Sequence, residues 1–284
     1  MKKKIGIIGS SGLIGSALKK HLDNFVIIEI PGRSLYGSPE LIAKSLENLD
    51  VIINLAGHPI NGRWTKKRKK LIYESRVSLT ANLIRAVAIM EKKPLQLINS
   101  SAIGIYRDSI ISDEETLEYA ENPIARLVKE WEKKAAEIRD LSVKLTIIRT
   151  GIVLSRKGGA YKLLRKIIKM GFGGIMGSGR QGYSFILLDD VVRAIEFIVN
   201  NQIDGIVNLV SPEPVDNKTF IKAMAGKLNR WSFFIVPGFV IKAIFSEGSV
   251  FILKGQKVLP GVLLKNNFRF IGNNLKTCLD ILEK

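Results

Sequence analysis

Short runs of apolar residues alternate with longer amphipathic stretches along the first half of the chain. The runs are rich in Ile, Val and Leu, as buried strands are, and they lie at residues 5–8, 25–30, 50–57, 95–102 and 145–149. The stretches between them carry apolar residues at helical spacing, as at residues 16–22. This alternation predicts an α/β fold, a Rossmann-like doubly wound parallel sheet with right-handed crossovers.

The pattern changes after residue 154. Glycine-rich segments at residues 158–159, 171–174 and 177–181 predict loops that shape the rim of a pocket. A helix that begins at Asp189 and Asp190, expected to be capped by these carboxylates, precedes a strand at residues 205–209. We therefore expect two parts. The sheet domain spans residues 1–154, with residues 182–210 returning to it, and residues 155–181 and 211–284 form a small C-terminal mixed α/β substrate lobe.

The first predicted strand ends in a turn with three glycines at Gly-x-x-Gly-x-x-Gly spacing. Gly9 allows a sharp turn, Gly12 lets the backbone approach a pyrophosphate, and Gly15 lets the helix and strand pack closely. The N–H groups that begin the next helix then face the phosphates. A tight turn that binds nothing is the alternative, but the position between a strand and a helix favours a dinucleotide site.

The end of the second strand bears on the choice of cofactor. An acidic residue there binds the ribose 2′-hydroxyl of NAD, whereas an arginine accommodates the 2′-phosphate of NADP. Arg33 lies 18 residues after Gly15, and Glu29 lies inside the strand rather than at its tip. An exposed loop arginine is the alternative. The spacing favours contact with the phosphate and therefore NADP.

The composition limits the classes of partner. The net charge of +18 comes largely from lysines in amphipathic helical stretches, without the basic and aromatic interleaving that stacks bases. We therefore expect no specific nucleic-acid partner. No Cys/His cluster or paired carboxylates have metal-ligand spacing, so no metal is expected.

The sequence also bears on the compartment. The single cysteine, Cys278, excludes an internal disulfide, and a reducing cytoplasm fits this. The most apolar later run, residues 233–245, contains Pro237, Gly238 and Lys242 and is too short to span a bilayer. We therefore expect a cytoplasmic protein without a membrane partner.

Motifs spread along nearly the whole chain resemble the extended short-chain dehydrogenase/reductase superfamily, and within it the atypical NADP-binding epimerase family group. They include Asn54-Leu55-Ala56-Gly57, Ser75-Arg76-Val77, Trp131-Glu132, Arg149-Thr150-Gly151 and Gly177-Ser178-Gly179-Arg180-Gln181. The resemblance implies a small-molecule substrate, a monomer or homodimer, and NADP contacts from Gly9, Ser10, Ser11, Gly12, Leu13, Ile14, Gly15, Arg33, Leu55, Ala56, Gly57, Arg76 and Val153.

The superfamily's usual catalytic pair, Tyr-x-x-x-Lys on a helix, is missing. In the alignment anchored on Glu132, Ile124 and Val128 occupy the two positions, and neither carries a proton. Ser101 occupies the superfamily's serine position, where it either binds a substrate carbonyl or caps a strand end. Tyr106 is the nearest phenol and the first candidate acid, with a buried structural tyrosine as the alternative.

Two functions follow from these residues. The first is an NADP(H)-dependent oxidoreductase or epimerase-like enzyme that acts on a sugar-nucleotide-like or carbonyl compound. The alternative, suggested by the missing Tyr/Lys pair, is a non-catalytic NADP(H)-binding regulator or sensor.

Overall fold

Six parallel strands form the central sheet of the computed structural model, which describes residues 2–60, 62–232 and 234–284 apart from the side chain of residue 251. Phe233, in the apolar run noted above, lies outside the described residues. The strand order is β2-β1-β3-β4-β6-β11, which confirms the predicted Rossmann-like fold. The strands are β1 (Lys4–Ile8), β2 (Val26–Ile30), β3 (Val51–Asn54), β4 (Gln96–Ala102), β6 (Lys144–Thr150) and β11 (Gly205–Leu209).

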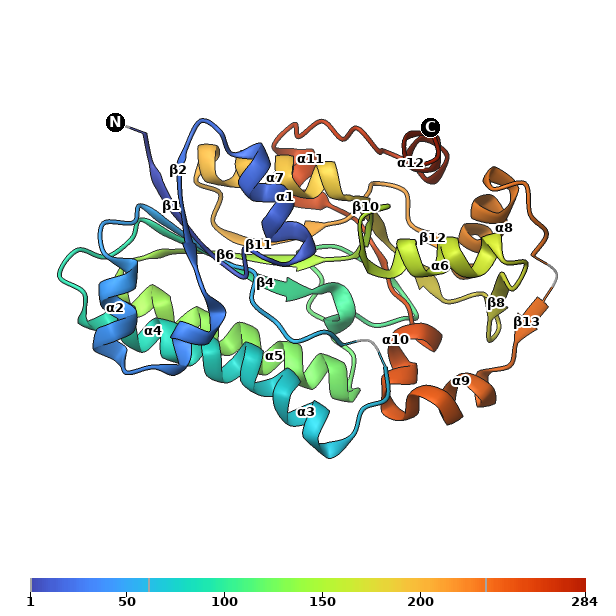
Figure 1. Ribbon diagram of the computed structural model, residues 1–284, viewed down its shortest axis with the longest axis horizontal. Helices are drawn as coiled ribbons and strands as arrows, with labels where there is room; N and C mark the ends of the chain where they lie inside the picture. The colour runs from blue at the N-terminus through green and yellow to red at the C-terminus, as the bar shows by residue number, and fades with distance from the viewer. Residues whose placement is uncertain (1, 61, 233) are drawn as a thin grey trace.

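Helices cover both faces of this sheet, below and above it in Figure 1. Ile7 and Ile8 point to opposite faces, and both are fully buried. Burial on both faces explains why the strands are runs of consecutive apolar residues. The lower face packs against α2 (Pro39–Leu46), α4 (Leu79–Ile89) and α5 (Pro123–Ala136); the upper face packs against α1 (Leu13–His21), α7 (Leu188–Asn201) and α11 (Gly261–Lys265).

A second group of elements lies at the end of the molecule away from β1 and β2 (Figure 1). It consists of short strand pairs and helices around a separate apolar core. The helices that pack on this core are α6 (Gly159–Lys169), α8 (Asn217–Lys227) and α12 (Leu275–Leu282), and the same end also holds α9 (Gly238–Phe245) and α10 (Val250–Leu253). The strand pairs are β7 (Ile152–Leu154) with β10 (Phe185–Leu187), β8 (Gly174–Met176) with β13 (Phe234–Val236), and β9 (Gly182–Tyr183) with β12 (Val215–Asp216).

Helix α6 was not among the predicted elements, because glycines on both sides of it suggested a continuous loop region. One more strand pair joins parts of the chain that are far apart in the sequence: β5 (Ile111–Ser112) lies beside β14 (Lys257–Val258). Helix α3 (Lys66–Tyr73) precedes α4. The division of the chain at residue 154 stays a prediction.

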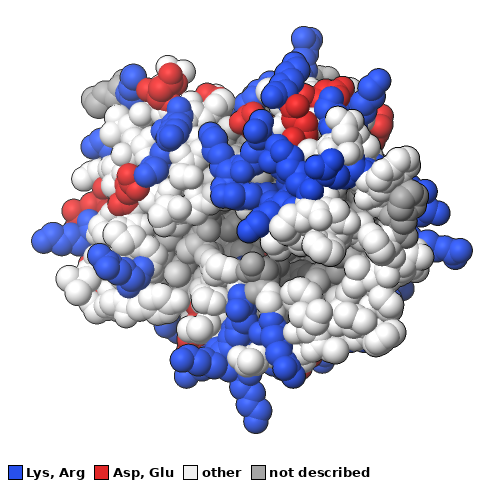
Figure 2. Space-filling view, turned by 45° about the vertical axis from the view of Figure 1, so that its right-hand side comes forward, with Lys and Arg blue, Asp and Glu red and all other residues white. Residues whose placement is uncertain are grey.

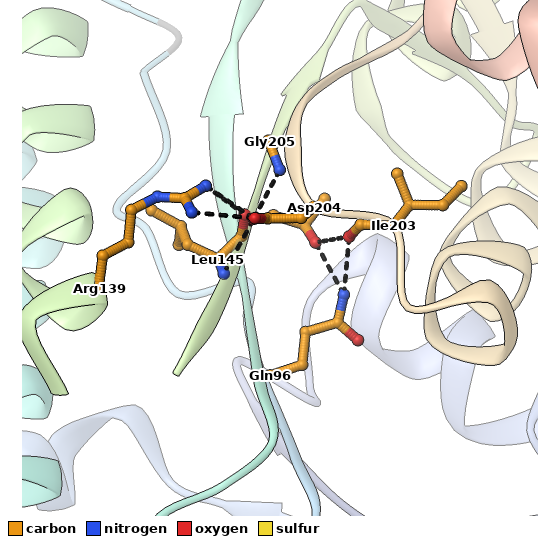
Figure 3. A network of polar contacts seen from close by, with 7 residues as sticks. Gln96, Arg139, Leu145, Ile203, Asp204 and Gly205 are labelled. Carbon is orange, nitrogen blue, oxygen red and sulfur yellow. Dashed lines mark hydrogen bonds and ion pairs between the residues drawn. The ribbon is translucent and has the colours of Figure 1, made fainter. Parts of the chain in front are cut away.

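A polar network fixes the amino ends of β6 and β11 (Figure 3). The Asp204 carboxylate accepts hydrogen bonds from Arg139 at 2.7 Å and from the Gly205 amide at 2.8 Å. The hydrogen bond from Arg139 lowers the pKa of Asp204. The Gln96 amide donates to the Ile203 carbonyl oxygen at 2.9 Å, which ties the entry of β11 to β4. These contacts fix β4, β6 and β11 relative to one another at their amino ends, and the glycine turn lies at the opposite ends of the strands.

The expected cap of α7 is wrong. Leu187 is the N-cap residue and makes no side-chain cap, and Asp189 is exposed. Asp190 lies inside the first helical turn, fully buried, and accepts hydrogen bonds from the amides of Ile271 and Gly272, both at 2.8 Å. The carboxylate therefore holds the C-terminal segment against α7, a contact that the local sequence does not reveal.

Candidate cofactor and catalytic site

The glycine turn has the tight geometry that its sequence predicts. Gly9 has a φ of +84°, and a Cβ atom there would lie 2.8 Å from the carbonyl carbon of Leu55. A Cβ atom on Gly15 would lie 2.3 Å from the Gly9 oxygen. Gly12 is the N-cap residue of α1. The turn therefore presents the amino end of α1 beside the carboxyl end of β3, where parallel sheets of this order bind ligands.

A cavity of about 370 Å³ opens beside this turn. Two lysines contribute to its wall, Lys20 from α1 and Lys157 from the segment after β7. With the amino end of α1, which has no acidic residue in its first turn, they make the cavity suitable for an anion. The other lining residues are Ser11, Gly12, Leu13, Ser16, Ala17, Gly158 and Leu188. The sequence analysis did not identify either lysine.

Arg76 provides a second positive charge near the end of β3. Its guanidinium donates to the His58 carbonyl oxygen at 3.0 Å and lies 5.4 Å from the centre of the Trp131 ring. A Cβ atom on Gly57 would lie 3.1 Å from it. No carboxylate in the described part of the chain pairs with Arg76, and burial lowers its pKa to about 10. This half-buried cation without a counter-charge is suited to an anionic ligand.

The other predicted cofactor residues of β3 and β7 surround the same region. Leu55 donates its amide to the Ile8 carbonyl oxygen at 2.9 Å, and Ala56 is buried against the lower face of the sheet. Val153 lies in β7 opposite Ile186 of β10. Whether these residues touch a cofactor stays a prediction.

The region expected to meet the ribose holds both an arginine and an acid. Arg33 lies exposed in a 3₁₀ turn, Gly32–Tyr36, and makes no hydrogen bond or ion pair with any described residue. Glu29 accepts a hydrogen bond from Ser10 of the glycine turn at 2.6 Å and pairs with Lys19 of α1 at 2.8 Å. Glu29 lies inside β2, as the sequence predicts, and its side chain still reaches the glycine turn because it leaves β2 on the side where Lys19 of α1 lies.

Ser101 lies at the carboxyl end of β4, above a buried ion pair. Its hydroxyl donates to Glu132 Oε1 at 2.5 Å. Arg149 of β6 donates to both oxygens of Glu132, at 2.9 and 2.7 Å, and only 1% of its side chain is exposed. Although burial disfavours its charge, the hydrogen bonds from Arg149 to Glu132 raise the pKa of Arg149. The charged carboxylate therefore fixes the orientation of the Ser101 hydroxyl.

Tyr106 belongs to the same network and is fully buried. Its hydroxyl donates to Asn208 at 3.0 Å and accepts from Arg149 at 2.8 Å. Burial raises the pKa of Tyr106 to about 12, although the Arg149 charge acts in the opposite direction. This environment keeps the phenol protonated and favours the structural role that we considered beside catalysis. The role of Tyr106 as an acid stays a prediction.

The positions of the missing Tyr/Lys pair are filled with core side chains. Ile124 and Val128 are 5% and 3% exposed and belong to the same apolar cluster as Tyr106. Glu132 shares a helix face with them, four residues after Val128. A carboxylate on an apolar helix face, such as Glu132, indicates a buried cation beside it. Arg149, at the end of the apolar strand at residues 145–149, is the cation that the sequence offers. The sequence analysis did not use this pairing.

Comparison with known proteins identifies the family. The model of the NAD dependent epimerase/dehydratase family matches residues 5–209, and that of DUF1731, a domain of unknown function, matches residues 236–282. An epimerase family protein of Staphylococcus epidermidis is 31% identical over 298 residues, covering 99% of both chains. The epimerase family protein YfhF of Bacillus subtilis is 36% identical over 249 residues, covering 84% of this chain and 80% of YfhF.

A solved structure agrees along the whole chain. The crystal structure of the human epimerase family protein SDR39U1 with NADPH has a TM-score of 0.89 and 25% sequence identity, and the match covers 99% of each chain. These matches confirm the resemblance that the motifs indicated. The chain belongs to the NAD-dependent epimerase/dehydratase family, within the extended short-chain dehydrogenase/reductases.

Proposed function

We propose that this protein is an NADP(H)-dependent oxidoreductase or epimerase-like enzyme that acts on a small molecule with a carbonyl or hydroxyl group. The observation that carries the proposal is the glycine turn, which presents the amino end of α1 at the carboxyl edge of the sheet with Arg76 nearby. Dinucleotide phosphates are anions of the kind that this arrangement accommodates.

The preference for NADP over NAD rests on Arg33. Its side chain is exposed and makes no contact that would hold it away from a 2′-phosphate, as far as the described residues go. Glu29 would favour NAD if it were unpaired, but Lys19 lies 2.8 Å from its carboxylate and offsets the charge. The structure of human SDR39U1 with NADPH supports the same choice.

NADP(H), when bound at this site, would supply the hydride chemistry, and the residues of this chain would orient the substrate. Ser101 touches the substrate oxygen. Because its proton is directed to Glu132, the Ser101 oxygen accepts a hydrogen bond from a substrate hydroxyl, and Arg149 keeps the carboxylate in place. Tyr106 is the candidate proton source for the opposite direction; its complete burial and its hydrogen bond to Asn208 favour the structural alternative, and the Tyr106→Phe variant separates the two.

Titration of NADPH fluorescence tests the cofactor assignment. The Arg33→Ala variant should bind NADPH about tenfold more weakly, with NADH binding unchanged, since only NADP(H) carries the 2′-phosphate. Arg269→Ala, at an exposed arginine after α11, is the matched control and should leave both affinities unchanged. Equal NADPH affinity in wild type and Arg33→Ala would remove the NADP assignment.

A panel of carbonyl compounds and nucleotide sugars tests for turnover, with NADPH absorbance as the readout of net reduction and product chromatography as the readout of epimerisation, because epimerisation returns the hydride to the substrate and leaves the NADPH absorbance unchanged. On any compound that reacts, Ser101→Ala should lower the rate by roughly a hundredfold or more if the hydroxyl orients the reacting oxygen. Tyr106→Phe gives a similar loss if the phenol is the acid and only a lower melting temperature if it is structural. NADPH binding without turnover across the panel would contradict the enzyme assignment.

A further inference from the structure

A group of large apolar side chains is exposed around β13 and α9. Phe234 and Ile235 of β13 are 61% and 63% exposed, and Phe239 of α9 is 73% exposed. We call this group the β13–α9 surface; it consists of Met170, Phe172, Trp231, Phe234, Ile235, Phe239 and Ile244, each more than half exposed. Scattered apolar side chains need no explanation, but a contiguous group marks an interaction site.

The backbone contacts bring these residues together from two parts of the sequence. Strand β13 pairs in parallel with β8, with Phe234 opposite Gly174. The Arg230 guanidinium donates to the Lys169 carbonyl oxygen at 3.1 Å, which places the start of the β13 segment beside Met170. Helix α9 follows β13 directly after Pro237. Figure 1 shows β8, β13 and α9 together at one end of the molecule.

Both faces of β13 are open to solvent at Phe234 and Ile235. Phe234 and Ile235 are successive strand residues and therefore point to opposite faces, yet both are exposed. Helix α9 packs inward chiefly through Ile241, at 3% exposed, and leaves Phe239 and Ile244 outside. The two elements form a protruding apolar edge rather than part of a core.

The two segments that contribute to the β13–α9 surface carry basic residues and no acidic ones. Residues 156–188 and 217–246 contain twelve Lys and Arg residues and no Asp or Glu. Within the described residues only two of the twelve, Arg165 and Lys227, pair with carboxylates, both on the C-terminal segment. In Figure 2, which turns this end of the molecule forward, an uncharged area is bordered by Lys and Arg side chains.

We propose that the β13–α9 surface docks on an anionic lipid bilayer, with its apolar side chains in the headgroup boundary and the flanking lysines and arginines on lipid phosphates. Exposed aromatic and aliphatic groups beside basic residues are the features of proteins that lie on such membranes. The expectation of no membrane partner rested only on the lack of an apolar run long enough to span a bilayer. The described helices contain no segment that could cross a bilayer, and a surface contact needs none.

Two other occupants fit the surface less well. A second copy of the chain would bring two acid-free segments together, so that like charges would face each other across the contact. A nucleic acid would use the aromatic rings for base stacking, but Met170, Ile235 and Ile244 have no planar face to offer. The mixture of aliphatic and aromatic groups with a basic border matches a lipid surface.

Vesicle binding tests the proposal on the full chain. Wild type should sediment with vesicles of phosphatidylcholine containing roughly one third phosphatidylglycerol, and much less with phosphatidylcholine alone. Phe234→Ser combined with Phe239→Ser should weaken the partition by about tenfold or more, because two exposed apolar side chains are lost. Lys169→Glu with Lys242→Glu should weaken it at low salt, and added salt should reduce the difference.

Leu117→Ser and Lys133→Glu are matched controls, since both residues are exposed and lie outside the β13–α9 surface. Trp231 gives a direct reading of insertion: it is 76% exposed, whereas Trp64 and Trp131 are buried, so quenching by brominated lipid reports on this surface.

Equal sedimentation of wild type and the Phe234→Ser/Phe239→Ser variant would overturn the proposal, as would no binding to anionic vesicles. A concentration-dependent dimer that the same variant abolishes would assign the surface to a second copy instead. Two further results together would count against a lipid surface: single-stranded RNA removes vesicle binding, and brominated lipid does not quench Trp231.

Discussion

At the scale of single residues, the most consequential feature is the ion pair under Ser101. Glu132 and Arg149 share two hydrogen bonds in a region from which water is almost excluded. Removing one member of a buried pair leaves the other charge without compensation, which costs far more than the pair contributes. The same pair sets the direction of the Ser101 hydroxyl, so stability and the candidate chemistry depend on one contact.

The Glu132→Gln variant should be destabilised by about 3 kcal/mol, because Arg149 keeps its charge when the carboxylate is gone. Urea unfolding at neutral pH measures this. Glu137→Gln on the same segment is the control: its pair with Lys134, at 2.6 Å, is 40% and 45% exposed, and its loss should cost below about 1 kcal/mol. Similar losses of unfolding free energy in the two variants would contradict this prediction, because they would mean that Arg149 does not need the Glu132 carboxylate to compensate its charge.

At the scale of elements, the β1–α1 connection combines a structural and a binding requirement. The glycines allow α1 to approach β1 so closely that the helix start lies beside the turn. The same approach directs the free amide groups toward the space where a phosphate would lie. A side chain at Gly15 would therefore disturb both packing and binding.

Gly15→Ala should lose about 1–3 kcal/mol of stability, because its Cβ would lie 2.3 Å from the Gly9 oxygen and the backbone must shift. Gly226→Ala, near the end of α8, meets no atom within 4 Å and should gain up to about 1 kcal/mol from the better helix propensity of alanine. Thermal unfolding compares the two, and NADPH titration should show a loss only for Gly15→Ala. Unchanged NADPH affinity in a folded Gly15→Ala variant would contradict the assigned role of the turn.

At the scale of the whole molecule, Asp190 connects the C-terminal segment to the sheet domain. Its carboxylate binds two amides of that segment, and Gly272 in turn accepts a weak hydrogen bond from the Cys278 thiol at 3.6 Å. Cys278 is the single cysteine of the chain and is fully buried, and burial raises its pKa to about 12. The thiol is therefore inert while the C-terminal segment stays in place.

Asp190→Ala should release the segment and increase the rate at which Cys278 reacts with a thiol reagent by roughly tenfold or more, since the hydrogen bonds that the carboxylate accepts from the Ile271 and Gly272 amides and from Arg193 are all lost. Asp189→Ala is the control, because that side chain is exposed. Cys278 should react at the same rate in wild type and Asp189→Ala, and faster in Asp190→Ala. A rate that does not change in Asp190→Ala would show that other contacts hold the segment.

Local pattern alone determined the strands of the central sheet, their alternation with helices and the glycine turn. Consecutive apolar residues in β1 and β3 mean burial on both faces, and this is a property of parallel sheets that can be read without knowing the partners. The turn was equally clear, because glycine is required by backbone geometry at Gly9 and by close packing at Gly15. The family resemblance came from motifs of the same local kind.

Only the tertiary structure decided which side chains meet. Glu132 and Arg149 are 17 residues apart, Glu29 reaches Ser10 from another strand, and Asp190 binds amides more than 80 residues away. Arg76 was predicted from the sequence, but its lack of a paired carboxylate among the described residues and the exposure of Phe234 and Ile235 depend on which elements lie beside them. Hydrogen bonds and burial depend on approach in space, and a period of two or 3.6 residues along the chain carries no information about that approach.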